Sequence, residues 1–117
     1  NWTDRGGLMS LNTLINVDKK DNLLVIIPEG DMDIYSSTRF KELVLDSYNK
    51  EKKDLLIDGK KLEYIDSTGL GALIGILKQV KEDNKKIYLS NIKPNIRKLF
   101  DITELDKLFI IRSENDE

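Results

Sequence analysis

Apolar and polar side chains alternate along the first part of the chain. Apolar or β-branched residues occupy every second position from Leu11 to Val17, the period of a strand with one face in water. After a polar turn, residues 23–27 predict a central strand. Pro28 should end it, because proline cannot donate a hydrogen bond to a sheet. Residues 36–38 then offer N-cap candidates for a helix whose apolar side carries Phe40, Leu43, Val44 and Tyr48.

The second half of the chain repeats a strand-and-helix order. Residues 54–58 predict a short buried strand, and residues 59–61 lead through Leu62 to a second helix that follows Ser67. This helix has the clearest periodicity, with apolar residues at i, i+3, i+4 and i+7 from Leu70. Residues 87–89 predict a further strand. Pro94 suits the first turn of another helix, and residues 108–111 predict a closing strand.

Helices that alternate with apolar strands after an initial hairpin predict an α/β fold. We expect a mixed sheet of about five strands, largely parallel after the hairpin and covered by about three to four helices. Functional loops in such sheets gather at the carboxyl ends of strands. Residues 31–37 and 66–69 both follow strands, so they should form one surface patch.

Length and composition limit the class of protein. The 117 residues support one domain, which we place at residues 9–117. Residues 1–8 are interpreted as a tag remnant or flexible tail, or alternatively as a native tail anchored by Trp2. The chain has no cysteine, and no apolar run approaches the roughly 20 residues of a membrane span. We therefore expect a cytoplasmic protein with no membrane partner.

Charge and residue types argue against several functions. The net charge of -2 lacks the positive field that a nucleic-acid partner requires. No histidine is present, so a Ser-His-Asp catalytic centre is excluded and no catalytic residue is predicted. The spacing of Gly69, Gly71 and Gly75 misses the dinucleotide-binding pattern by one residue, and no Walker sequence occurs. We therefore expect neither an enzyme nor a cofactor.

The loop carboxylates are weak candidates for a metal site. Three of the four residues Asp31, Asp33, Asp58 and Asp66 follow or end strands near the predicted patch, where a hard cation would find oxygen ligands. No EF-hand spacing accompanies them, and acidic residues are common in turns and helix caps. No metal is predicted.

Residues 64–71 place a hydroxyl pair, Ser67 and Thr68, where a glycine-containing helix begins. A helix N-terminus has unpaired N–H groups that tolerate phosphate, so Ser67 is better suited to modification than to nucleophilic chemistry. Phosphorylation would add roughly 1.5 to 2 negative charges. The helix N-terminus stabilises the added negative charge by about 0.3 to 1 kcal/mol, so the fold should persist. A partner docked on the site should be repelled.

Several segments carry a family resemblance: residues 30–33, 56–58, 65–71 and 96–103. With these segments the chain resembles the anti-sigma factor antagonists, the single-domain branch of the STAS family. The resemblance implies a STAS-like fold and a partner-switching cycle. The unmodified antagonist binds an anti-sigma factor and releases the sigma factor. The anti-sigma factor is itself a serine kinase that phosphorylates the antagonist, and a PP2C-type phosphatase reverses the modification.

The resemblance also implies roles for individual residues. Ser67 becomes the phosphoacceptor, with Thr68 as a minor alternative. The predicted partner-binding residues are Asp31, Asp33, Ser36, Asp66, Thr68, Gly69, Gly71, Ala72 and Gly75. Gly71, Ala72, Gly75 and Ile76 would form a smooth helix flank, for which packing inside the protein is the alternative.

Two further expectations follow from the resemblance. The family commonly has glycine where this chain has Glu104, so we expect the turn there to differ, since glutamate adopts a left-handed backbone at a cost of about 1 kcal/mol or more. The alternative function is a STAS scaffold module of a stress-sensing assembly or an anion transporter, which binds without a phosphorylation cycle.

Overall fold

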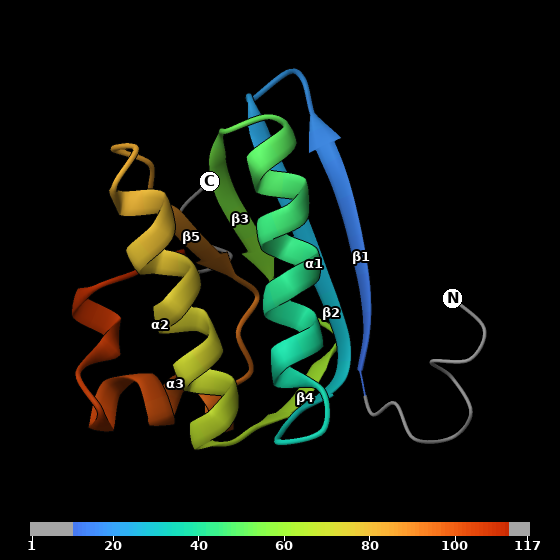
Figure 1. Ribbon diagram of the computed structural model, residues 1–117. Helices are drawn as coiled ribbons and strands as arrows, with labels where there is room; N and C mark the ends of the chain where they lie inside the picture. Colours follow the sequence, from blue (N-terminus) through green and yellow to red (C-terminus); the bar gives the residue numbers. More distant parts are fainter. Residues whose placement is uncertain (1–10, 113–117) are drawn as a thin grey trace.

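A mixed sheet forms the centre of the fold, and helices α1 and α2 lie side by side across one of its faces (Figure 1). The computed structural model describes residues 11–112, so the interpretation of residues 1–8 lies outside the described residues. The strands are β1 Leu11–Asp18, β2 Leu23–Met32, β3 Asp54–Asp58, β4 Leu62–Ile65, β5 Ile87–Ser90 and β6 Ile110–Arg112. The helices are α1 Ser37–Lys50, α2 Ser67–Lys81 and α3 Pro94–Ile102, and a short 3₁₀ turn, Leu105–Lys107, precedes β6.

The strand order is β1-β2-β3-β5-β6, and β4 pairs with β2 outside this path. β1 and β2 are antiparallel, whereas the pairs β2–β3, β2–β4, β3–β5 and β5–β6 are all parallel. The predicted mixed sheet, largely parallel after an initial hairpin, is therefore confirmed. Among residues 11–112 the sheet has six strands where about five were expected. The additional strand is β4, which was not predicted as a strand of its own.

The prediction that the central strand ends at Pro28 is wrong, because β2 continues to Met32. On its parallel side, Ile26 is the last β2 residue paired with β3, and Gly30 is the first paired with β4. Pro28 falls between these partners, at a position without a parallel neighbour, where a missing N–H is tolerated. The change of partner thus allows proline inside a central strand.

The core lies between the sheet and the two covering helices. Buried apolar side chains of β2, β3 and β5 meet the apolar stripe of α2, which was predicted from its periodicity and includes Leu73, Leu77 and Val80. Tyr48 of α1 is also buried, and its hydroxyl donates a 2.6 Å hydrogen bond to Asp83. No helix among the described residues is long and apolar enough to cross a membrane.

The turn after α3 does not differ in the way expected from the sequence. Glu104 adopts the left-handed conformation, with φ of 63°, so the backbone keeps the shape that glycine would permit. The other non-glycine residues with positive φ among the described residues are Asn22, Asn84 and Asn91, a residue type that tolerates this conformation. The closing strand also begins later than predicted, at Ile110, because the N–H groups of Leu108 and Phe109 donate to the Leu105 carbonyl of the 3₁₀ turn.

Candidate functional site

The candidate site lies where β2 and β4 end side by side. Met32 and Ile65 are partners in the parallel register, so the two segments that follow them begin at the same edge of the sheet. The Asp66 N–H donates to the Met32 carbonyl at 3.2 Å and ties the start of α2 to the end of β2. The predicted surface patch of residues 31–37 and 66–69 is therefore present.

The loop before α1 is held by a buried serine. Ser36 is 1% exposed, and its hydroxyl accepts from the Asp33 N–H at 3.0 Å and donates to the Asp31 carbonyl at 2.8 Å. The Asp33 carboxylate also accepts from the Tyr35 N–H at 2.9 Å. Since the Ser36 side chain is enclosed, it shapes the loop and does not present itself to a partner. The prediction that Ser36 binds a partner directly is thereby corrected.

Asp66 caps the N-terminus of α2. Its carboxylate accepts from the N–H groups of Thr68 at 2.9 Å and Gly69 at 3.1 Å, and from the Thr68 hydroxyl at 2.5 Å. The hydrogen bond from the Thr68 side chain, together with those from the backbone, lowers the pKa of Asp66 below its ordinary value despite some desolvation. The N–H groups of Thr68 and Gly69, which were expected to be available to a phosphate, are thus already bound to the Asp66 carboxylate.

The two loops also meet through side chains. The hydroxyl oxygens of Ser37 and Thr68 lie 3.3 Å apart, and the Ser37 hydroxyl donates to the Asp33 carbonyl. Ser37 is buried and was predicted only as a cap candidate. Its contact joins α1, the Asp33 loop and the start of α2.

Ser67 differs from its neighbour in having an uncommitted hydroxyl. It is the first residue of α2 and is exposed, and its hydroxyl has no hydrogen bond to any of residues 11–112. Thr68 is also exposed, but its hydroxyl is bound to Asp66 and faces Ser37. Of these two exposed residues, Ser67 is therefore the one whose hydroxyl is not engaged with a described residue.

Gly69 allows the start of α2 to approach the sheet closely. A Cβ atom at this position would lie 2.6 Å from Ile65 Cγ1 and 2.8 Å from the Met32 carbonyl oxygen. The residue is buried. Its role is therefore to let the turn fit against the ends of β2 and β4.

The predicted flank of α2 is only partly at the surface. Gly71 is exposed, and a Cβ atom there would meet nothing within 4 Å. Ala72 and Ile76 are buried, and the Lys41 side chain lies over Gly75, with Nζ 2.6 Å from the position of a Cβ. Packing inside the protein therefore accounts for Ala72 and Ile76, and Gly71 is the exposed residue of the flank with open space around it.

Three exposed apolar residues around the site were missed. Ile34 is 67% exposed and Tyr35 79% exposed, both in the loop between Asp33 and Ser36, and Tyr64 of β4 is half exposed. In the sequence, the adjacent apolar residues Ile34 and Tyr35 inside a polar loop were the signal that could have indicated this exposed surface. Within residues 11–112, no group of three or more acidic side chains is arranged to hold a metal ion.

Comparisons with known proteins agree on one family. A family model described as STAS domain matches residues 15–117. The anti-sigma-B factor antagonist of Bacillus subtilis (strain 168) is 30% identical over 106 residues, which are 91% of this chain and 96% of that protein.

Solved structures show the same fold. An anti-sigma factor antagonist from Mycobacterium paratuberculosis has a TM-score of 0.77 at 22% identity, covering 87% of this chain and 85% of that one. The Bacillus cell fate determinant SpoIIAA in its phosphorylated form has a TM-score of 0.68 at 17% identity, covering 88% and 93%. The resemblance inferred from residues 30–33, 56–58, 65–71 and 96–103 is confirmed, and the chain belongs to the STAS domain family.

Proposed function

We propose that the chain is an anti-sigma factor antagonist whose binding to its partner is switched off by phosphorylation of Ser67. The observation that carries this proposal is the exposed, uncommitted Ser67 hydroxyl at the start of α2, beside the Asp33 loop. The relative from Bacillus subtilis is named an anti-sigma-B factor antagonist, and the phosphorylated form of SpoIIAA has the same fold as this chain. The chain is then a substrate and a binder in the cytoplasm, without catalysis of its own.

The reaction at Ser67 needs an enzyme from outside. The partner kinase would transfer the γ-phosphoryl group of ATP: a bond forms between Ser67 Oγ and phosphorus, the bond to the leaving ADP oxygen breaks, and a base of the kinase takes the hydroxyl proton. A PP2C-type phosphatase would hydrolyse the ester and restore the serine.

The local charges explain why the modification would act on binding. Asp66 already uses the N–H groups of Thr68 and Gly69, so a phosphate on Ser67 would find fewer donors than a bare helix end provides. The new charge would be added next to the Asp66 carboxylate at an exposed position. The fold persists because nothing buried is disturbed. A partner that accepts the unmodified surface would meet a desolvated like charge, which costs several kcal/mol.

The partner surface combines acidic and apolar groups. The exposed side chains of Ile34 and Tyr35 supply apolar area beside the site, and Gly71 leaves the flank of α2 open. Asp31 and Asp33 contribute charge at the loop, while Ser36 and Gly69 fix the shape of the two segments. The anti-sigma factor would therefore cover the Asp33 loop, Ser67 and the first turns of α2 together.

Labelling by the kinase tests the acceptor. The chain is incubated with a cognate anti-sigma factor kinase and ATP, and the phosphate is mapped by mass spectrometry in wild type, Ser67→Ala and Thr68→Val. We expect labelling to disappear in Ser67→Ala and to remain in Thr68→Val, the matched control at the adjacent hydroxyl. Unchanged labelling of Ser67→Ala would refute the assignment.

Calorimetry tests the switch separately. The enzymatically phosphorylated chain should bind the anti-sigma factor at least 100-fold more weakly than the unmodified chain, as a cost of about 3 kcal/mol requires. Its circular dichroism should be unchanged. Equal affinities of the two forms would overturn gating even if Ser67 is the acceptor.

A further inference from the structure

An open pocket of about 490 Å³ lies at the carboxyl ends of β3, β5 and β6. Lys60 follows β3, Asn91 and Ile92 follow β5, and Arg112 ends β6. These strands are parallel, so their carboxyl ends share one edge of the sheet. Ligands of open α/β sheets bind outside this edge.

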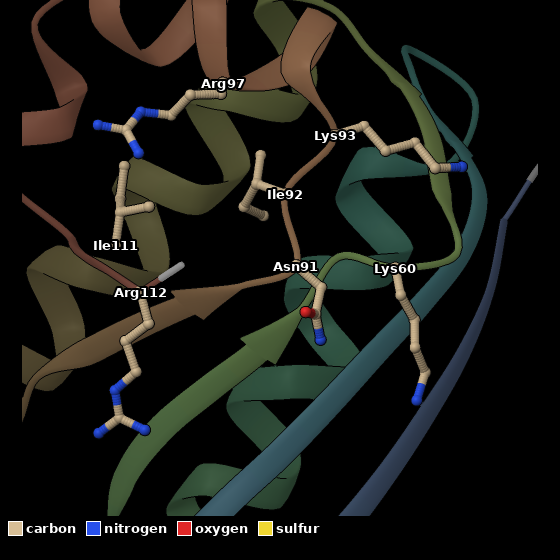
Figure 2. A pocket seen from close by; sticks show the side chains of 7 residues that line it. All are labelled: Lys60, Asn91, Ile92, Lys93, Arg97, Ile111 and Arg112. Atoms are coloured by element: carbon tan, nitrogen blue, oxygen red, sulfur yellow. The ribbon is translucent and has the colours of Figure 1, made fainter. Parts of the chain in front are cut away.

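The charged side chains that line the pocket are all cations, although the chain as a whole is slightly acidic. The lining includes the cations Lys60, Lys93, Arg97 and Arg112, and none of the carboxylates of residues 11–112. In Figure 2 these four side chains extend from around Ile92 and Asn91, and their charged ends point in different directions. With a net charge of -2 for the whole chain, this concentration of cations is local and favours an anion.

The cations can exchange their present partners for a ligand. Three of them form ion pairs with carboxylates outside the lining: Lys60 with Asp58 at 3.4 Å, Lys93 with Glu63 at 2.7 Å and Arg97 with Asp101 at 2.9 Å. At least one side chain of each pair is a third or more exposed, and surface pairs of this kind hold weakly.

Arg112 is the cation without a carboxylate partner among the described residues. Its guanidinium carbon lies 4.3 Å from the centre of the Tyr88 ring, in a cation–π contact. An arginine in such a contact can still donate N–H groups to a planar or tetrahedral anion.

The pocket also has an apolar surface. Ile92 and Ile111 are partly buried and pack against the core. Gly59 makes room for Ile92, because a Cβ atom there would lie 2.6 Å from Ile92 Cδ1. Cations around an apolar surface suit an anion with an apolar body.

We propose that this pocket binds a small organic phosphate, with the side chains of Arg97 and Arg112 turning toward the phosphate and the isoleucines against the organic part. None of the lining residues belongs to the Ser67 site, so the proposal does not depend on the proposed function. The pocket would give the domain a second input, from a small molecule.

Nuclear magnetic resonance titration of the full ¹⁵N-labelled chain tests the proposal. The probes are phenyl phosphate, inorganic phosphate and sodium chloride at matched ionic strength. We expect saturable shifts of the Asn91, Ile92 and Arg112 amides with both phosphates, and tighter binding of phenyl phosphate because of the apolar surface. Shifts that follow ionic strength alone would overturn the proposal.

Matched variants locate the contact. Arg112→Gln and Arg97→Gln should each weaken phenyl phosphate binding roughly tenfold, the value of a charge-assisted hydrogen bond. The control is Arg39→Gln on α1, which also removes an arginine from a surface ion pair, here with Glu42, and should leave binding unchanged. Equal weakening in the control, or binding of an acidic peptide but of neither phosphate, would refute the proposed site.

Discussion

The hydroxyl groups of Ser37 and Thr68 lie 3.3 Å apart although the residues are 31 positions apart in the chain. This contact joins the first residue of the α1 helix to the first turn of α2. Asp33 is held by the same arrangement, since its carbonyl accepts the Ser37 hydroxyl. The Asp33 loop and the start of α2 are thus one structural unit.

Ser37→Ala should loosen this unit. The buried hydroxyl would be lost, and with it the hydrogen bond to Asp33, so we expect a loss of about 1 kcal/mol in the free energy of unfolding. Hydrogen exchange should become faster at residues 33–36 and 66–68. The control is Ser47→Ala in the same helix, where no hydrogen bond of the side chain to a described residue is lost and alanine is the better helix former. Equal effects of the two substitutions would contradict the role of Ser37.

The two glycines at the start of α2 should respond in opposite directions. Gly69→Ala would place a Cβ atom 2.8 Å from the Met32 carbonyl oxygen, which is backbone and cannot move cheaply, so we expect a loss of about 1 to 3 kcal/mol. Gly71→Ala meets open space and should stabilise the helix by up to about 1 kcal/mol. Urea unfolding of both variants measures this difference. A stabilised Gly69→Ala would show that the close approach to β2 is absent.

Much of the fold was predictable because local patterns and tertiary structure agree. The stripe of α2 and the strand at residues 54–58 follow directly from apolar periodicity and run length. β4 was missed because its four residues alternate weakly, and its place is set by pairing with the far half of β2. The prediction that the strand ends at Pro28 failed for the same reason. Proline is tolerated there because β2 pairs with β3 up to Ile26 and with β4 from Gly30 onward.

The candidate site was predictable as a location but not in its contacts. Ser67 could be placed at a helix start from the sequence, and the structure has it there as an exposed residue. Which residues turn inward could not be read from residue type: Ser36 is enclosed, while Ile34 and Tyr35 are exposed. Such choices depend on how two loops distant in sequence pack together.

Asp66→Asn should show a stability difference that depends on pH. The pKa of Asp66 is lowered in the folded chain, so its carboxylate stabilises the fold above the unfolded pKa of about 3.9, and this contribution is lost as pH falls through the lower folded value. Wild type should therefore be more stable than the variant near pH 6, and the difference should shrink toward pH 3. Asp83, whose pKa is also lowered, is present in both proteins and cancels. Thermal unfolding from pH 2.5 to 6 tests this, and a difference that stays constant over that range would contradict it.

Glu104→Gly should stabilise the chain. Glutamate at φ of 63° carries a left-handed cost of about 1 to 2 kcal/mol, which glycine avoids. Glycine gives back part of the gain, because it has more freedom in the unfolded chain and because the 3.1 Å exposed ion pair with Lys107 is lost. The net gain expected is about 0.5 to 1 kcal/mol.

Glu104→Ala separates the two effects, because it removes the ion pair and keeps a Cβ atom in the left-handed conformation. We expect this control to be neutral or slightly destabilised in urea unfolding, with glycine above both wild type and alanine. Glycine and alanine variants of equal stability would mean that the backbone at Glu104 carries no strain. The turn lies after α3, on different elements from Ser67, so kinase labelling should be the same in all three proteins.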